Sequence, residues 1–390
     1  MRVGIIGAGA AGLVAGIYAS LRHDVTILER NNVVGKKLLI TGNGKCNYFN
    51  SDMGINHYND ERVLSLLNDG DELLSLFDRI GIIPKVENGY YYPFSGNSYS
   101  VQEALLLECQ LNNVDIMYNF CVKSIIKEDK FLVSSEDEVL EFDKIIITTG
   151  SKAYPKTGSD GNGYDLLSSL GHRINPVILA LTYLVGDNAF QSGWNGVRCD
   201  ASIKLYHDSD FIKEESGEIQ LTKNGVSGIC IFNLSRYITT NNRLEINFVP
   251  WCHSISDVLL FFDKRSNKVT GRNLDHFFEG FLHYKLVRVI LDILGLDKEK
   301  YYDELNKKEK YNLARYMFSF PFDVIDVGPF DRAQVCRGGV FLDEINMDNM
   351  ESLKVNGLFI AGEVLDVDGD CGGYNLMFAF LSGMRAGKSV

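Results

Sequence analysis

The sequence predicts an α/β protein in which a parallel-sheet domain is split along the chain by a β-rich region and a helical segment. Three observations predict this arrangement. A buried strand, a glycine-rich turn and an apolar helix open the chain at Val3. Apolar and polar residues alternate in segments after Leu184, as is typical of strands. A strand and a helix of the opening kind return after Gly357, and 390 residues are enough for more than one core.

The opening stretch has the pattern of a dinucleotide-binding unit. Gly7, Gly9 and Gly12 follow the first strand in Gly-x-Gly-x-x-Gly spacing. The first glycine permits a tight turn, the second lets the backbone approach a phosphate, and the third lets the helix over 10–21 pack on the strand. A second strand ends at Glu29, whose carboxylate can accept hydrogen bonds from a ribose diol. The sequence therefore predicts a Rossmann-like site for NAD or FAD, because the glycines and the immediate second strand argue against a membrane anchor.

Composition limits the partners and the compartment. The formal charge of −12 at pH 7 argues against nucleic acid or an anionic membrane as the partner. Eight cysteines without a Cys-x-x-Cys pair, in a chain that shows no secretion signal, are expected to be free thiols in the cytoplasm. The acidic residues of 366–370 suggest a calcium loop, but Cys371 and Met377 stand where such a loop needs glycine and glutamate. No metal site is therefore predicted.

The segment 35–50 is expected to be a loop whose backbone lies over a phosphate and a planar ring, since it contains three glycines and three lysines. Cys46 within it is expected to pack or to form part of the site wall, because no resolving partner for a redox thiol is visible. The tyrosines 90–92 are consecutive, and neighbouring residues of an extended segment point to opposite sides. At least one of them is therefore expected to face a cavity.

Two later strands are expected to end beside the same ligand. One ends in Thr149 and Gly150, and the other, which begins at Gly357, ends in Gly362 and Glu363. Ligands collect at the carboxyl ends of parallel strands. The last helix begins at about 372–375, and its N-terminus suits negative charge on a ring system. Together these features favour FAD over NAD. A long cofactor needs the first helix for its pyrophosphate and the start of the last helix for its ring system.

The middle of the chain divides by pattern. Period-two alternation over 201–206 and 244–248 indicates antiparallel strands, and apolar residues at steps of three and four indicate helices between 254 and 320. Three domains are therefore expected. They are a cofactor domain of 1–185 plus 345–390, a β-rich substrate domain of 186–253 plus 321–344, and a helical insertion of 254–320.

These motifs together resemble the BaiN-like family of NAD(P)/FAD-dependent oxidoreductases, which are flavoproteins with two dinucleotide-binding domains. The matching stretches are GAGAAG (7–12), GKKLLITGNGKCN (35–47), TTGSKAYPKTGSDGNGY (148–164), AQVCRGGV (333–340) and GLFIAGEVLDVDGDCGGYNLMFAFLSG (357–383). The resemblance implies an FAD-binding Rossmann-like domain interrupted by a β-barrel-like domain, itself interrupted by a small helical domain. With the motifs above, the residues expected to hold FAD are Gly7, Gly9, Ala10, Ala11, Gly12, Glu29, Arg30, Lys37, Leu38, Gly42, Gly44, Cys46, Asn47, Val122, Thr149, Gly150, Gly362, Glu363, Gly373, Asn375 and Leu376.

The resemblance also implies an enzyme that transfers a hydride between flavin N5 and a small organic substrate. We expect reduction of a conjugated C=C bond, enone or steroid-like, with NAD(P)H as a transient donor. Lys45, Tyr92 and Asn375 are the candidate catalytic residues. An FAD-dependent oxidase of aminoacetone-type amines that uses oxygen stays open, as does a non-catalytic flavin redox sensor. Tyr90 and Cys371 stand where the family has Arg and Thr, so the substrate is not carried over, and the oligomeric state is left open.

Overall fold

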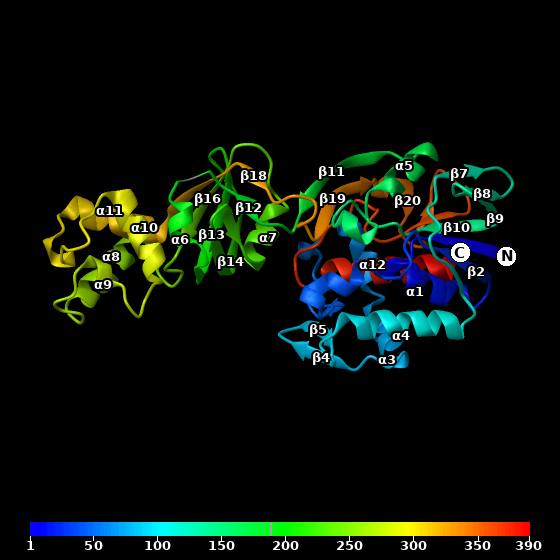
Figure 1. Ribbon diagram of the computed structural model, residues 1–390, viewed down its shortest axis with the longest axis horizontal. Helices are drawn as coiled ribbons and strands as arrows, with labels where there is room; N and C mark the ends of the chain where they lie inside the picture. Colours follow the sequence, from blue (N-terminus) through cyan, green and yellow to red (C-terminus); the bar gives the residue numbers. More distant parts are fainter. Residues whose placement is uncertain (188) are drawn as a thin grey trace. The chain divides into compact units, whose positions relative to one another are not determined.

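Strand β1 (Arg2–Ile6) is flanked on both sides by parallel strands, in the first of two units into which the chain divides (Figure 1). The computed structural model describes residues 1–187 and 189–390. The first unit comprises Met1–Ala180 with Phe330–Val390, and the second comprises Leu181–Pro329. Each unit contains its own cluster of buried apolar side chains.

The main sheet of the first unit has the strand order β20-β21-β22-β10-β1-β2-β6. The strands from β22 to β6 run parallel, so their carboxyl ends share one edge of the sheet. Both faces are covered, which is why β1 and β10 are apolar runs without alternation. The other strands are β2 (Asp24–Leu28), β6 (Asp115–Met117), β10 (Lys144–Ile147), β20 (Ile345–Asn346), β21 (Glu351–Ser352) and β22 (Leu358–Ile360).

Helices α1 (Ala10–Ala19) and α12 (Tyr374–Ser389) cross at very short range. A Cβ added at Gly383 would lie 2.3 Å from the carbonyl oxygen of Ala11, and one at Gly387 would lie 2.4 Å from that of Ala15. Only glycine permits this approach at these two positions, which are four residues apart on one helix face. Because α1 lies between the sheet and α12, it is buried on almost every side, and this accounts for its apolar sequence.

Within the part of the chain that the structure describes, no helix has the length and the apolar character that crossing a membrane requires. The remaining helices of the first unit are α2 (Leu64–Leu67), α3 (Gly70–Arg79), α4 (Ser98–Leu111) and α5 (Asn162–Ser169). Its smaller sheets contain β3 (Phe49–Asn50), β4 (Pro84–Glu87) and β5 (Tyr90–Pro93), then β7 (Ser124–Lys127), β8 (Phe131–Ser134) and β9 (Val139–Phe142), and finally β11 (Ile174–Ala180) and β19 (Val335–Val340).

The second unit is built on an antiparallel sheet with the order β17-β16-β13-β14-β15-β12-β18. Its strands are β12 (Leu184–Val185), β13 (Arg198–His207), β14 (Asp210–Thr222), β15 (Gly225–Ser227), β16 (Asn242–Asn247), β17 (Phe320–Val324) and β18 (Asp326–Val327). Its helices are α6 (Gln191–Trp194), α7 (Ile229–Ser235), α8 (Ile255–Ser266), α9 (Leu274–Phe277), α10 (Tyr284–Leu294) and α11 (Lys307–Phe318).

The two units differ from the expected domain boundaries in two places. Strand β19, expected in the β-rich domain of 186–253 plus 321–344, pairs with β11 inside the first unit. The segment 254–320, expected as a helical domain of its own, shares one buried cluster with the antiparallel sheet. The physical reason is that its apolar helix faces bury against strand side chains, and Phe248 N–H donates to the Met317 carbonyl at 2.9 Å across this contact.

Candidate functional site

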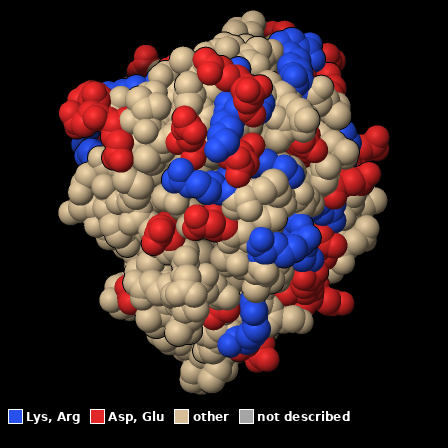
Figure 2. Space-filling view, turned by 90° about the vertical axis from the view of Figure 1, so that its right-hand side faces the viewer, with Lys and Arg blue, Asp and Glu red and all other residues tan. Residues whose placement is uncertain are grey.

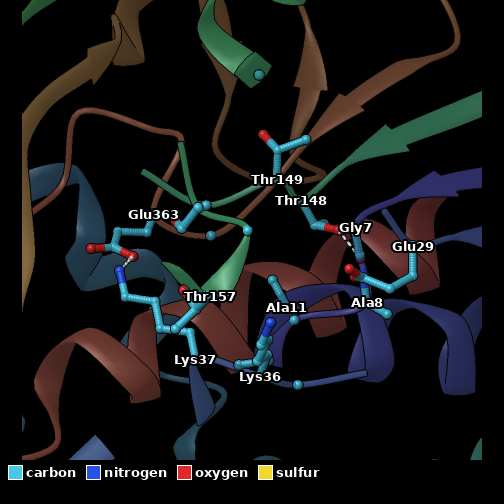
Figure 3. Close-up of a pocket in the computed structure, with 18 of the residues that line it drawn as sticks. Gly7, Ala8, Ala11, Glu29, Lys36, Lys37, Thr148, Thr149, Thr157 and Glu363 are labelled. Atoms are coloured by element: carbon cyan, nitrogen blue, oxygen red, sulfur yellow. Dashed lines mark hydrogen bonds and ion pairs between the residues drawn. The ribbon is translucent and has the colours of Figure 1, made fainter. Parts of the chain in front are cut away.

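A cavity that is open to solvent lies at the carboxyl ends of β1, β2, β10 and β22 (Figure 3). All of its lining residues belong to the first unit. Figure 3 shows Glu29 and Ala8 at one end of the view, and Lys37 with Glu363 at the other. The residues expected from the sequence that line it are Gly7, Gly9, Ala10, Ala11, Glu29, Arg30, Lys37, Leu38, Val122, Thr149, Gly150, Gly362, Glu363, Asn375 and Leu376.

The glycine turn after β1 brings an open helix end to this cavity. Gly7 has a φ of +102°, and the Thr148 hydroxyl donates to its carbonyl oxygen at 2.8 Å. A Cβ at Gly12 would lie 1.9 Å from the same oxygen, so this glycine sets how closely α1 approaches the turn. A Cβ at Gly9 would meet no described atom within 4 Å. No described side chain caps α1, so the N–H groups of its first turn are available to an anion.

Glu29 is buried at the end of β2 and is fixed from two sides. One carboxylate oxygen accepts from the Ala8 N–H at 2.9 Å. The other accepts from the backbone N–H and the side-chain amide of Asn31, at 2.8 and 2.7 Å. The oxygen that accepts from Ala8 keeps a second lone pair, whereas the oxygen that faces Asn31 uses both of its lone pairs. The carboxylate is therefore held in place while it still has capacity to accept from a ligand hydroxyl.

The loop 155–161 is fastened to the same end of the cavity. Arg30 donates to the Gly158 carbonyl at 3.1 Å and pairs with the Asp160 carboxylate at 2.5 Å. The Asn31 amide donates to the Thr157 carbonyl at 3.1 Å. Because Thr157, Gly158 and Asp160 line the cavity, these bonds connect the residues after β2 to a wall contributed by a distant part of the chain.

Lys37 and Glu363 form an ion pair at the other end, with 2.6 Å between the ammonium nitrogen and Oε2. Oε1 of Glu363 is buried and has no hydrogen-bond partner among the described residues. The Thr149 hydroxyl, also in the lining, is likewise buried without a described partner. Buried polar atoms rarely stay unpaired in a folded protein. The Thr149 hydroxyl lies against Gly163, where an added Cβ would be 1.8 Å away, so Oε1 of Glu363 is the better candidate to accept from a ligand hydroxyl.

The start of α12 borders the same end, and no described side chain caps it. Asn375 uses both ends of its amide to hold the preceding loop: Oδ1 accepts from the Gly369 N–H at 2.9 Å, and Nδ2 donates to the Gly369 carbonyl at 2.8 Å. An amide engaged in this way positions the loop and the helix end. Its second amide proton points to the Asp370 carbonyl, at 3.4 Å, so both protons face the loop, which weakens the expected catalytic role of Asn375.

Several expected residues lie outside the lining of the cavity: Gly12, Gly42, Gly44, Lys45, Cys46, Asn47, Tyr92 and Gly373. Cys46 is fully buried, and burial raises the pKa of its thiol to about 12, so it packs in the core instead of forming the site wall. Asn47 packs on the start of α12, where a Cβ at Gly373 would lie 2.9 Å from its Oδ1. Lys45 is exposed on the surface.

The sequence interpretation missed several lining residues, notably Asn31, Lys36, Thr41, Phe120 and Gln334. Lys36 and Thr41 lie in the loop that was expected to cover the ligand, so position in that loop was an available signal. Gln334 enters the lining from before β19, far along the chain, and no local pattern points to it. Among the described residues, no group of His, Cys, Asp and Glu side chains could hold a metal ion.

Comparison with known proteins agrees with this geometry. A family model described as "HI0933-like protein Rossmann domain" matches residues 1–389. The 3-dehydro-bile acid delta(4,6)-reductase of Clostridium scindens is 35% identical, over 100% of this chain and 98% of its own. The ribosomal RNA dihydrouridine synthase of Haemophilus influenzae is 27% identical, over 99% of this chain and 97% of its own.

Among solved structures, the 3-ketosteroid-delta4-(5alpha)-dehydrogenase of Rhodococcus jostii superposes with a TM-score of 0.53. It is 14% identical and covers 99% of this chain and 96% of its own, so this likeness shows a shared fold. The predicted α/β fold with a Rossmann-type domain is thereby confirmed. The chain belongs to the HI0933-like family of Rossmann-domain proteins, and its predicted assignment to the flavin-dependent oxidoreductases is confirmed with it.

Proposed function

We propose that this protein is an FAD-dependent reductase that saturates a conjugated carbon–carbon double bond in a small organic molecule, an enone or steroid-like ketone, with NAD(P)H as the electron donor. The observation that carries the proposal is a full-length relative, 35% identical, that is named as a delta(4,6)-reductase. The cavity at the carboxyl ends of the parallel strands supports it, because its polar groups suit a dinucleotide.

Three features of the cavity fit FAD. The uncapped first turn of α1, with open space at Gly9, suits a pyrophosphate. The fixed carboxylate of Glu29 suits the hydroxyls of a ribose. The buried oxygen Oε1 of Glu363, which has no partner among the described residues, suits the hydroxyl groups of a ligand. FAD combines these three chemical groups, and we assign the residues to them in this order.

When bound, FAD supplies hydride transfer to or from carbon. The chain itself contributes position and charge. The open N-terminus of α12 carries about half a positive charge, which stabilises an anion held beside it. Lys37 neutralises Glu363, so that a carboxylate in the cavity does not repel a ligand that becomes negative on reduction.

The experiment is an anaerobic mixing series with the purified holoenzyme. Its flavin band is recorded after addition of NADH or NADPH, and again after addition of a 3-oxo-Δ4-steroid. We expect the band to bleach with one nucleotide and to return with the enone, with one saturated ketone formed for each flavin reoxidised. The saturated ketone is the matched control and should leave the flavin reduced. Reduction by small amines, with oxygen as the only reoxidant and peroxide as product, would instead establish the oxidase.

A second candidate substrate comes from the relative that is named a ribosomal RNA dihydrouridine synthase. Uracil contains a double bond conjugated to a carbonyl, so its reduction is the same chemistry on a polyanion. The formal charge of −12 makes RNA a poor partner for this chain. On the face of the molecule in Figure 2, basic and acidic side chains are interspersed. Adding ribosomal RNA to the reduced holoenzyme tests this candidate, and we expect no reoxidation.

A further inference from the structure

The three tyrosines of strand β5 point to two different sides of the strand. Tyr91 points into the core, where its ring meets the rings of Phe49 and Tyr48 edge-on, at 5.2 and 6.2 Å between centroids. Because side chains alternate along a strand, Tyr90 and Tyr92 point to the other side. Tyr92 lies next to Gly42, where an added Cβ would be 3.9 Å from its ring. Tyr90 therefore has a different neighbour from either of the other two.

That neighbour is the loop between β22 and α12. A Cβ at Gly372 would lie 2.5 Å from the ring of Tyr90, so the ring rests directly on this glycine. Asn50 is paired with Tyr90 across the strands, and its amide donates to the Gly372 carbonyl at 2.9 Å. Two residues that share one face of the small sheet thus contact the same loop position.

The loop is held by several hydrogen bonds, and it adjoins the cavity. Asn375 holds Gly369 through two hydrogen bonds, and His57 binds the Asp370 carboxylate at 2.9 Å. The Cys371 thiol is 3.9 Å from Oε1 of Gln334. Gln334 and Asn375 both line the cavity, at the end where α12 begins. Tyr90 is therefore held against the loop that leads to the lining residue Asn375, although it is not itself part of the lining.

The surroundings of Tyr90 keep its hydroxyl protonated. Burial raises its pKa above the ordinary value, and the nearby Cys371 and Asp370 raise it further. Burial also raises the pKa of Cys371 to about 11, with the charge of Asp370 adding to the effect. Tyr92 and Tyr374 are further titratable neighbours, and burial raises the pKa of both. At neutral pH, Tyr90 is a neutral hydroxyl that can donate a proton.

We propose that Tyr90 donates the proton that completes the reduction of the substrate. The inference rests on the proposed function. One alkene carbon receives a hydride from the reduced cofactor, the double bond opens to an enolate, and the other carbon takes the proton of the Tyr90 hydroxyl. The product is the saturated ketone, and the phenolate regains a proton from water. None of Tyr90, Tyr92 and Lys45 is in the lining of the cavity, and Tyr90 replaces the other two as the acid because its ring rests on Gly372, three residues before the lining residue Asn375.

The test compares the holoenzyme with its Tyr90→Phe variant in separate half-reactions. Anaerobic reduction by NAD(P)H should be unchanged, because no substrate proton is transferred in it. Reoxidation by the enone should slow by about 10²–10⁴-fold, the usual contribution of a general acid. Tyr91→Phe is the matched control, since it removes the same atom from the adjacent residue on the opposite face, and its reoxidation rate should stay within about twofold of wild type.

The outcomes separate this inference from the proposed function. If wild-type reduced enzyme is not reoxidised by any enone, the proposed function fails. If wild type reacts and Tyr90→Phe reacts within about twofold of it, only the assignment of Tyr90 is overturned. If Tyr90→Phe does not retain FAD, 3-fluorotyrosine at position 90 keeps the shape and lowers the phenol pKa. The alkaline limb of the reoxidation rate should then move to lower pH, and an unmoved limb would overturn the assignment.

Discussion

Replacing Gly12 by alanine should lower the stability of the protein, whereas replacing Gly9 by alanine should weaken FAD binding. At Gly12 the new Cβ would lie 1.9 Å from the Gly7 carbonyl oxygen and 2.7 Å from the Thr148 hydroxyl that binds this oxygen. Overpacking of this kind costs about 1–3 kcal/mol, and loss of the hydrogen bond adds about 1 kcal/mol. We therefore expect the free energy of unfolding of the cofactor-free protein to fall by about 2–4 kcal/mol in Gly12→Ala.

At Gly9 the Cβ would meet no described atom within 4 Å, and the φ of −82° is one that alanine adopts freely. The cofactor-free Gly9→Ala protein should be as stable as wild type, or more stable by about 0.4–1 kcal/mol, because the unfolded chain loses freedom. The methyl group would instead project to where a phosphate approaches. We expect FAD affinity to fall about 10- to 100-fold, which corresponds to about 1.4–2.8 kcal/mol.

Urea unfolding of the cofactor-free proteins and FAD titration of each variant measure the two effects separately. In the unfolding experiment, Gly9→Ala is the control, because its added methyl group should not destabilise the protein. In the FAD titration, Gly12→Ala is the control, because its added methyl group lies inside the protein and not where a phosphate approaches. Wild-type FAD affinity in Gly9→Ala would refute the placement of a phosphate at this turn. Wild-type stability of Gly12→Ala would refute the close packing of α1 on the turn after β1.

Three further outcomes are expected. Glu29→Gln leaves one of the N–H donors of Ala8 and Asn31 facing an amide NH₂, so isothermal titration should show weaker FAD binding, and unchanged affinity would contradict the role of the carboxylate. Burial alone would raise the pKa of Glu344, but hydrogen bonds from Arg173 and Lys354 outweigh it and lower the pKa to about 2. The pKa of this carboxyl in the unfolded chain is 4.5. The stability that Glu344 contributes by being ionised in the folded protein is therefore fully present above pH 4.5 and is lost as pH falls toward 2. Urea unfolding across this range should show the loss in wild type and less of it in Glu344→Gln. Cys46, with its pKa of about 12, should resist alkylation at neutral pH in the folded protein, as peptide mass spectrometry can check.

The cofactor end of the site could be predicted from the sequence because its geometry is local. The turn at Gly7, the spacing to Gly12 and the acid at the end of β2 are consecutive features of one βαβ unit, and the structure brings Gly7 and Glu29 together in the lining of the cavity. The strand ends at Thr149 and Glu363 could be predicted as well. Parallel pairing alone places them at the same edge of the sheet.

The rest of the site depends on contacts between distant segments, which no local pattern encodes. The loop 155–161 is fixed by Arg30 and Asn31, and Gln334 enters from before β19. The alternation of the tyrosines was visible in the sequence. Which face points to the loop at Gly372 depends on the pairing of β5 with β3, so the face of Tyr90 could not be chosen beforehand.

The domain boundaries show the same limit. Strand β19 contains two adjacent glycines. It follows the β-rich segment along the chain, and its residue pattern is similar to that of the segment. Its partner β11 lies well over a hundred residues earlier. A Cβ at Gly338 would lie 2.2 Å from the Pro176 carbonyl oxygen, so the glycine is required by this pairing. Strand pairing over such a separation is decided by the whole fold.

The most direct test of the proposed function is reoxidation of the reduced holoenzyme in the absence of oxygen. The flavin is first reduced with NADH or NADPH and is then mixed with a conjugated 3-oxo-Δ4-steroid. The proposal predicts that the oxidised flavin band returns and that one saturated ketone forms for each flavin. A flavin that stays reduced with every conjugated ketone, and is reoxidised only when oxygen is admitted, would contradict it.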